Sequence, residues 1–218
     1  AQVVYLDSYP LNEFSMYGAV PLREIKHQLL TLKKAGKLDR VKMLLLTNCT
    51  FDGLVYNVER VMEECLAIKP DLVFLWDEAW FAYGRFSPTL RKRSGMWAAR
   101  TLREELRSES YREQYAAWKE SFDELDPDDD ATWLDQRLMP DPYQSKVRVY
   151  ATQSTHKTLT SLRQGSMIHV FDQEFEHSAQ APFDEAFMTH TSTSPNYQIL
   201  ASLDVGRRQV ELEGYELV

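Results

Sequence analysis

The sequence is most informative at Tyr150-Ala-Thr-Gln-Ser-Thr-His-Lys-Thr-Leu159. A β-type run from Val147 to Thr152 ends there in a polar cluster that carries Ser154, His156 and Lys157. A lysine just beyond a strand end, between a histidine and small hydroxyl residues, suits an amine that loses its charge and forms a Schiff base with an aldehyde. The alternative is a solvated lysine in a loop, which is common for motifs this short.

A second informative stretch lies upstream and reads Asp71-Leu-Val-Phe-Leu-Trp-Asp-Glu-Ala-Trp80. Its continuous apolar run predicts a strand buried on both faces of a parallel sheet, with Asp77 at the carboxyl end. Ligands of open α/β sheets bind outside these carboxyl ends, so we expect Asp77 and Lys157 to face one crevice. Such a pair matches the two protein groups that pyridoxal phosphate requires, a Schiff-base lysine and a carboxylate that keeps the pyridine nitrogen protonated.

Further short motifs occur on both sides of these two stretches. In chain order the motifs are Thr47-Asn-Cys-Thr-Phe-Asp-Gly53, Tyr56-Asn57, Asp77-Glu-Ala-Trp80, Phe86-Ser-Pro88, Thr152-Gln-Ser-Thr-His-Lys157, Ser166-Met-Ile-His-Val170 and His190-Thr-Ser-Thr-Ser-Pro195. Together they resemble the major domain of the bacterial ornithine/lysine/arginine decarboxylases, over nearly the whole chain except about residues 90–145. That family has the aspartate-aminotransferase-like fold of pyridoxal-phosphate enzymes.

The resemblance implies decarboxylation of a basic amino acid to the corresponding amine and CO2. It makes Lys157, Asp77 and His156 catalytic: Lys157 holds the cofactor aldehyde, and the negative charge of Asp77 favours the pyridinium. Ser154 and His156 are assigned to contacts with the cofactor phosphate and the Schiff base, and Ala79 to packing on the ring face. The residues leave open which of ornithine, lysine and arginine is the substrate.

Two further cofactor-binding residues are Trp80 and Ser192. Trp80 either walls the pocket or is an ordinary core aromatic. Ser192 belongs to a hydroxyl run before a predicted helix, for which Ser194-Pro195 is the N-cap and first-turn signal. A helix amino terminus attracts anions, although simple capping needs only Ser194. The resemblance implies that Ser192 reaches the cofactor phosphate across a subunit interface.

The remaining pattern predicts an α/β fold with a mainly parallel central sheet and flanking helices, as part of an aspartate-aminotransferase-like large domain. Strands, helices and a loop alternate along the first part of the chain: a strand Gln2–Leu6, a loop Asp7–Val20, a helix from Pro21 to Gly36, a strand Val41–Leu46, a helix after Asp52-Gly53 and the strand ending at Asp77. This alternation is typical of parallel pairing with right-handed crossovers. Asp172 to Pro182 is predicted to be a polar connection with an exposed His177, and His169 a packed core histidine.

Residues 90–145 are predicted to be a helical, acidic insertion in a partial major domain that spans residues 1–218. Asp123–Asp130 holds six acids in eight residues. We expect helices at the periphery of the sheet that are dispensable for the chemistry. The acidic run favours a solvated helix end over a metal site, because metal-binding loops interleave acids with glycine turns.

Composition excludes several other classes of function. Of 218 residues, 44% are hydrophobic and 27% charged, as in ordinary soluble domains. The net charge of -8 argues against nucleic-acid binding. No apolar run approaches the roughly 20 residues of a membrane span, and no secretory signal is present. Two cysteines without metal spacing fit a reducing cytoplasm. We therefore expect a small-molecule substrate, no nucleic-acid or membrane partner, and a homo-oligomer of two or more subunits.

The chain looks like a fragment of a longer protein. In the family, a phosphate-binding loop and a ring-stacking histidine lie upstream of the first motif found here, and a further domain lies downstream. We therefore expect the isolated piece to be inactive. Two alternatives remain open: another pyridoxal-phosphate reaction, such as transamination or another lyase step, and a non-catalytic oligomerisation scaffold.

Overall fold

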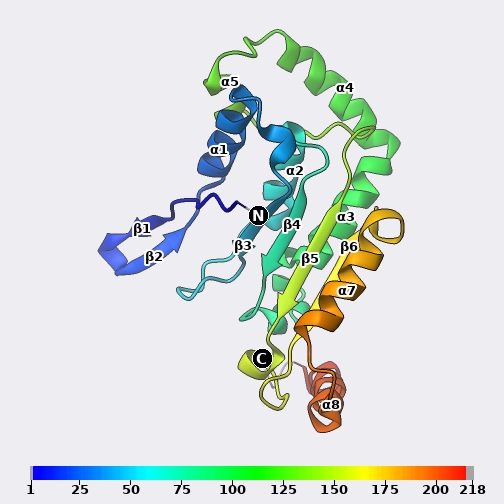
Figure 1. Cartoon of the computed structure of the whole chain (residues 1–218). Coiled ribbons are helices and arrows are strands. Elements are labelled where there is room, and N and C mark those ends of the chain that lie inside the picture. The colour runs from blue at the N-terminus through cyan, green and yellow to red at the C-terminus, as the bar shows by residue number, and fades with distance from the viewer. Residues whose placement is uncertain (1, 215–218) are drawn as a thin grey trace.

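A four-stranded sheet organises the computed structural model, which describes residues 2–214 (Figure 1). The strand order is β3-β4-β5-β6. Its strands are β3 (Met43–Thr47), β4 (Val73–Asp77), β5 (Arg148–Gln153) and β6 (Met167–Asp172). The first three run parallel and β6 is antiparallel to β5, which confirms the predicted α/β class with a mainly parallel sheet.

The helices of the described residues are, in chain order, α1 (Leu22–Lys34), α2 (Val58–Ile68), α3 (Gly95–Arg107), α4 (Glu109–Asp123), α5 (Asp130–Leu134), α6 (Thr155–Thr158), α7 (Gln180–His190) and α8 (Tyr197–Glu213). Of these, α2 lies in the crossover from β3 to β4, and α3, α4 and α5 lie in the crossover from β4 to β5 that parallel strands need. The predicted helix after Pro21 is confirmed as α1. Among residues 2–214, no helix is both long and apolar enough to span a lipid bilayer.

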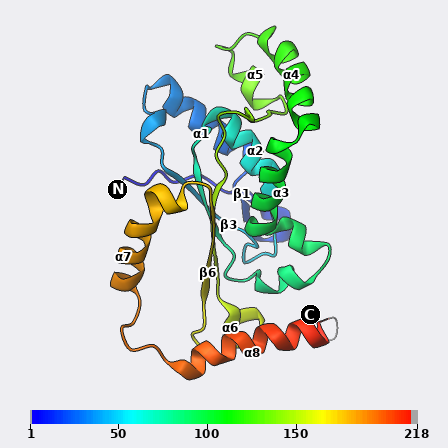
Figure 2. The same ribbon diagram turned by 90° about the vertical axis from the view of Figure 1, so that its right-hand side faces the viewer.

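The two faces of the sheet are covered unequally. Phe74 and Trp76 are buried on the face that α2 and α3 cover, whereas Val73, Leu75 and Asp77 on the other face are only half-buried. The prediction of a strand buried on both faces is therefore wrong for β4. Figure 2 shows the cause, because α7 is the helix on the second side and lies over the β6 edge. At the opposite edge, β3 exposes Met43 and Leu45.

Helix α3 is part of the core. Ala98, Ala99 and Leu102 on its inner face are all fully buried, in the same cluster as Phe74 and Trp76. The expectation that all of residues 90–145 lie at the periphery is therefore wrong for α3. The expectation of a peripheral position is correct for α4, which extends away from the sheet (Figure 1). Tyr111 is the buried residue of this helix.

The amino-terminal segment differs from its prediction. No strand forms at Gln2–Leu6; instead β1 (Tyr9–Leu11) and β2 (Met16–Ala19) form an antiparallel hairpin where a loop was predicted. Gly18 has φ +75, and a Cβ there would lie 1.8 Å from the Tyr9 carbonyl oxygen, so the hairpin requires glycine. The Asp52 carboxylate accepts a hydrogen bond from the Gly18 N–H at 3.0 Å, which ties the hairpin to the loop after β3.

The carboxy-terminal segment contains more helix than predicted. After a single π-helical turn at Phe175–Ala179, helix α7 begins at Gln180, inside the stretch predicted to be a polar connection. Pro182 lies in the first turn of α7, where the missing N–H costs no helical hydrogen bond. His177 is exposed, as predicted.

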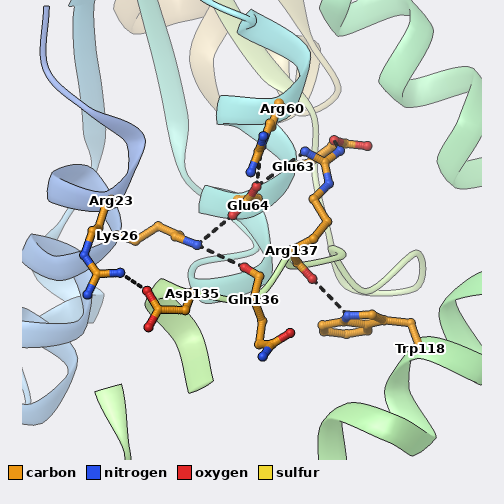
Figure 3. Close-up of polar contacts among 9 residues, drawn as sticks. All are labelled: Arg23, Lys26, Arg60, Glu63, Glu64, Trp118, Asp135, Gln136 and Arg137. Atoms are coloured by element: carbon orange, nitrogen blue, oxygen red, sulfur yellow. Dashed lines mark hydrogen bonds and ion pairs between the residues drawn. The ribbon is translucent and has the colours of Figure 1, made fainter. Parts of the chain in front are cut away.

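A buried ion pair ties α1 to α2 (Figure 3). The Lys26 ammonium donates to the Glu64 carboxylate at 2.7 Å and to the Gln136 carbonyl oxygen at 3.2 Å. Both charged side chains are almost completely buried, with exposed fractions of 3% and 0%. Arg60 and Arg137 also contact Glu64, so that carboxylate is compensated from three sides. Charges buried this deeply require such partners.

Candidate active site

The candidate site lies at the edge of the sheet where β3, β4 and β5 all end. Thr47, Asp77 and Thr152 are opposite one another in the parallel register. Hydrogen bonds continue past the strands, from Asn48 N–H to the Asp77 carbonyl at 2.9 Å and from Glu78 N–H to the Thr152 carbonyl at 2.8 Å. The structure therefore brings Asp77 and the turn that carries Lys157 to one edge, as the sequence predicts.

Asp77 is half-buried and oriented by its own turn. Its Oδ1 accepts a hydrogen bond from the Ala79 N–H at 3.1 Å. Within residues 2–214, no lysine or arginine pairs with this carboxylate, and its Oδ2 receives no hydrogen bond. Asp77 therefore presents one oxygen that is available to a ligand, and half-buried Ala79 lies beside it.

Lys157 lies on α6, directly after β5. Its Nζ is 5.3 Å from the centroid of the Trp80 ring, a cation–π contact between two residues predicted to share the site. Lys157 is exposed. Trp80 is 39% exposed and meets Phe51 edge to face at 5.5 Å between centroids. Trp80 is therefore not a core aromatic, and the pocket-wall interpretation remains.

His156 and Ser154 flank Lys157 on the same turn. His156 Nδ1 lies 2.8 Å from the Gly165 carbonyl oxygen. Because a carbonyl only accepts, Nδ1 carries the proton and a neutral ring keeps Nε2 as an acceptor. Ser154 is half-buried and precedes α6 without using its side chain as a cap. Within residues 2–214, both side chains therefore keep a polar atom without a partner on the turn that carries Lys157.

The structure does not bring Ser192 to this edge through any hydrogen bond within the described residues. Ser192 is exposed in the link between α7 and α8, where its hydroxyl accepts from the Ser194 N–H at 3.1 Å. The predicted N-cap is wrong, because Asn196 caps α8 by accepting from the N–H groups of Gln198 and Ile199. Asparagine is an equally good N-cap and lies directly before the first helical residue.

Comparison with known proteins identifies the family. The family model for the Orn/Lys/Arg decarboxylase major domain matches residues 1–117 and 134–217. The chain belongs to this family. Lysine decarboxylase LdcA of Pseudomonas aeruginosa is 33% identical over 206 residues, which are 92% of this chain and 22% of LdcA. The biodegradative arginine decarboxylase of Escherichia coli is 31% identical over 196 residues, which are 90% of this chain and 20% of that enzyme.

Solved structures of decarboxylases have the same fold. Lysine decarboxylase A from P. aeruginosa superimposes with a TM-score of 0.63 at 32% identity, over 95% of this chain and 23% of that one. The constitutive lysine decarboxylase of E. coli gives a TM-score of 0.59 at 26% identity, over 95% of this chain and 22% of that one. The chain thus spans about a fifth of the length of the decarboxylases it matches.

A residue beside the site whose structural role the sequence interpretation missed is Glu78. Its fully buried carboxylate accepts from the Gly95 N–H at 2.6 Å and from the side-chain amides of Asn48 and Gln153, each at 3.1 Å. Burial raises the pKa of Glu78, and these three donors oppose that rise. The alternation of side chains along a strand could have predicted that Glu78 is buried. The residue after Asp77 points to the opposite face of the sheet, into the core.

The Glu78 network continues to His169. Gln153 Oε1 lies 3.2 Å from His169 Nε2, and burial lowers the pKa of that imidazole. His169 is half-buried rather than fully packed, and its partner is polar, which refines the prediction of a core histidine. Together these contacts join the loop after β3, the start of α3, the end of β5 and strand β6 through Glu78, the residue next to Asp77.

The residues at this edge fit the pyridoxal phosphate that the family implies. The cofactor requires a lysine and a carboxylate facing one crevice. Within residues 2–214, neither Lys157 nor Asp77 is neutralised by an ion pair, and each has a polar atom open to a ligand. A structural ion-pair network would have joined these charges to other partners. Their availability is what a cofactor site at this edge requires.

Proposed function

We propose that the protein containing this chain is a pyridoxal-phosphate-dependent decarboxylase. It would convert ornithine, lysine or arginine to the corresponding amine and CO2. The observation that carries the proposal is the convergence of Asp77 and Lys157 at the joined ends of β4 and β5, in a chain of the decarboxylase family. We assign the domain to the aspartate-aminotransferase-like fold, for which the mainly parallel sheet and its antiparallel strand β6 are the support.

Two charged residues would carry the chemistry. When bound, pyridoxal phosphate supplies an electron sink for the bond between the substrate Cα and its carboxylate. Asp77 would keep a proton on the pyridine nitrogen, because a negative charge within hydrogen-bonding distance favours the protonated form. Lys157 would hold the cofactor aldehyde through its amine and release it to the substrate amine. Trp80, beside Lys157, would wall the pocket and exclude water.

The polar residues around Lys157 would hold and orient the cofactor. Ser154 would donate its uncommitted hydroxyl to the phosphate. His156 would contact the lysine end of the cofactor through Nε2, because Nδ1 is fixed by Gly165. Ala79 would pack on the ring face, and Ser192 would reach a phosphate in a neighbouring subunit, where its exposure makes it accessible.

The longer protein, rather than this piece alone, would be the active unit, and we propose that it is a cytoplasmic homo-oligomer. The length of the relatives, of which the chain spans about a fifth, supports the first part of this proposal, and the resemblance to the family supports the second. We infer that the acidic insertion is narrower than 90–145 and centres on 118–133. The family model passes over those residues, whereas α3 belongs to the core.

The proposal is tested by assaying the full-length protein with lysine, ornithine and arginine. Cofactor-dependent release of CO2 from at least one substrate is expected, and Lys157→Ala should abolish it. Lys37→Ala, which removes an exposed lysine remote from the edge, should retain it. A keto acid as the product, or full CO2 release by Lys157→Ala, would contradict the proposal.

A further inference from the structure

A cationic pocket lies at the opposite end of β5 from Lys157. It has a volume of about 270 Å3 and is lined by Arg103 and Arg107 of α3, Arg112 of α4 and Lys146, two residues before β5. Figure 1 shows the junction of α3 and α4 beside the start of β5. The six residues of β5 separate this pocket from the candidate active site by about 20 Å.

The pocket carries an excess of positive charge. The one carboxylate that lines it, Glu174, pairs with Lys146 at 3.2 Å. Arg103, Arg107 and Arg112 form no ion pair with any carboxylate in the part of the chain that the structure describes. Three positive charges around one cavity repel each other. An anion bound between them would be attracted to all three and would offset this repulsion.

Aromatic rings orient two of these guanidinium groups. Arg103 lies over the Phe171 ring at 5.7 Å, and Arg112 lies over the Tyr143 ring, also at 5.7 Å. A guanidinium group that stacks through its face keeps the N–H donors around its edge free. The rings thus hold the two arginines in place while their donors stay available to a ligand.

Two residues that line the same pocket each carry a buried polar atom without a partner. Arg103 Nε and Ser145 Oγ are both buried, and neither forms a hydrogen bond within residues 2–214. Buried polar groups without partners are rare in folded proteins, so each requires an explanation. Both belong to residues that line one cationic pocket, where a bound anion would offer acceptors to side chains that turn toward it.

We propose that this pocket binds a small phosphate-bearing anion, at a site separate from the candidate active site. Arginine presents a planar fork of N–H donors that matches the oxygens of a phosphate group, and three such forks match more than one negative charge. The Ser145 hydroxyl would donate a further hydrogen bond. Pyrophosphate has phosphate oxygens and more than one negative charge, and it is small enough for the pocket. It is therefore a suitable probe.

Calorimetric titration of pyrophosphate into the full-length protein tests the proposal. We expect saturable binding at one site per chain, weakened at least tenfold by Arg103→Gln and by Arg107→Gln. Arg107 is exposed, so its replacement leaves the fold intact. The matched control is Arg100→Gln on the same helix, because Arg100 is exposed and pairs with Glu104 outside the pocket; binding should be unchanged.

Two further titrations identify the binding site of the anion and the chemical class of the ligand. If Lys157→Ala weakens pyrophosphate binding and the pocket variants do not, the anion binds at the candidate active site and the proposal is wrong. Tighter binding of succinate than of pyrophosphate would contradict the claim that the ligand carries phosphate. Absence of saturable binding, or an equal loss in Arg100→Gln, would overturn the site itself.

Discussion

The Nζ of Lys157 lies 5.3 Å from the centroid of the Trp80 ring, although the two residues follow different strands of the sheet. Trp80 comes after β4 and Lys157 after β5, and the two strands are joined in parallel from Phe74 to Asp77. This contact shows that the two most informative stretches of the sequence share one edge.

Asp77→Asn in the full-length protein should preserve the fold and lower turnover by roughly a hundredfold or more, within the range for losing a group that controls a proton. A neutral amide no longer favours a protonated ring nitrogen. Decarboxylation rates with the cofactor bound provide the measurement. Asp71→Asn, at an exposed position two residues before β4, is the control and should turn over normally. Near-normal turnover of Asp77→Asn would count against the assignment.

Glu78→Gln should lower the free energy of unfolding by roughly 1–3 kcal/mol, the cost of leaving a buried donor without an acceptor. Three N–H donors face this carboxylate, and an amide offers only one oxygen to accept them. Urea unfolding measures the change. Glu120→Gln, on the exposed surface of α4, should have almost no effect. Equal stability of the two variants would show that the Glu78 network is not structural.

Glu63 should make stability depend on pH. Burial raises the pKa of its carboxyl from 4.5 to about 7, despite the opposing charge of Arg137. The folded state therefore binds this proton more tightly than the unfolded state, so the free energy of unfolding falls as the pH rises from 4.5 to 7 and is level above 7. The contribution is at most about 3 kcal/mol.

Glu63→Gln should remove this component, so that urea unfolding at pH 5 and pH 8 differs less in the variant than in the parent. Glu59 and Glu105 lie beside Glu63 and remain in both proteins, so they do not affect the comparison to first order. Glu104→Gln, on an exposed side chain of α3, serves as control. A parent that gains stability relative to Glu63→Gln between pH 5 and pH 8 would contradict the sign.

Lys26→Met should destabilise the protein by about 3 kcal/mol, at the lower end of the range for breaking a buried ion pair. Glu64 would keep Arg60 and Arg137 but lose its most buried partner. Arg23→Met, on the same helix, breaks an exposed pair with Asp135 and should cost less than about 1 kcal/mol. Equal losses in urea unfolding would mean that burial does not set the strength of the Lys26 pair.

The sequence predicts the parts of this structure that depend on local pattern. Alternating strands and helices predict parallel pairing, and parallel pairing places the strand ends together. That step places Asp77 and Lys157 at one edge of the sheet, whereas their roles rest on the resemblance to the family. Glu78 was missed because its role depends on Gly95 and Asn48, which approach it only in the folded chain.

Tertiary packing decides the remaining differences. The charged sequence around α3 gave no sign that Ala98 and Ala99 face the core, since small residues leave a weak hydrophobic pattern. The apolar run of β4 predicted two covered faces, but helices α2 and α3 bury one of them more completely than the other. Ser194 and Asn196 are both good N-caps. Asn196 is the cap because α8 begins at Tyr197, the residue directly after it. The role of Ser192 remains a prediction.

The central claim is that Lys157 carries the cofactor. The full-length protein, incubated with pyridoxal phosphate, reduced with borohydride and digested, should give one modified peptide in mass spectrometry, with the pyridoxyl group on Lys157. Modification of another lysine, or of none, would contradict the account.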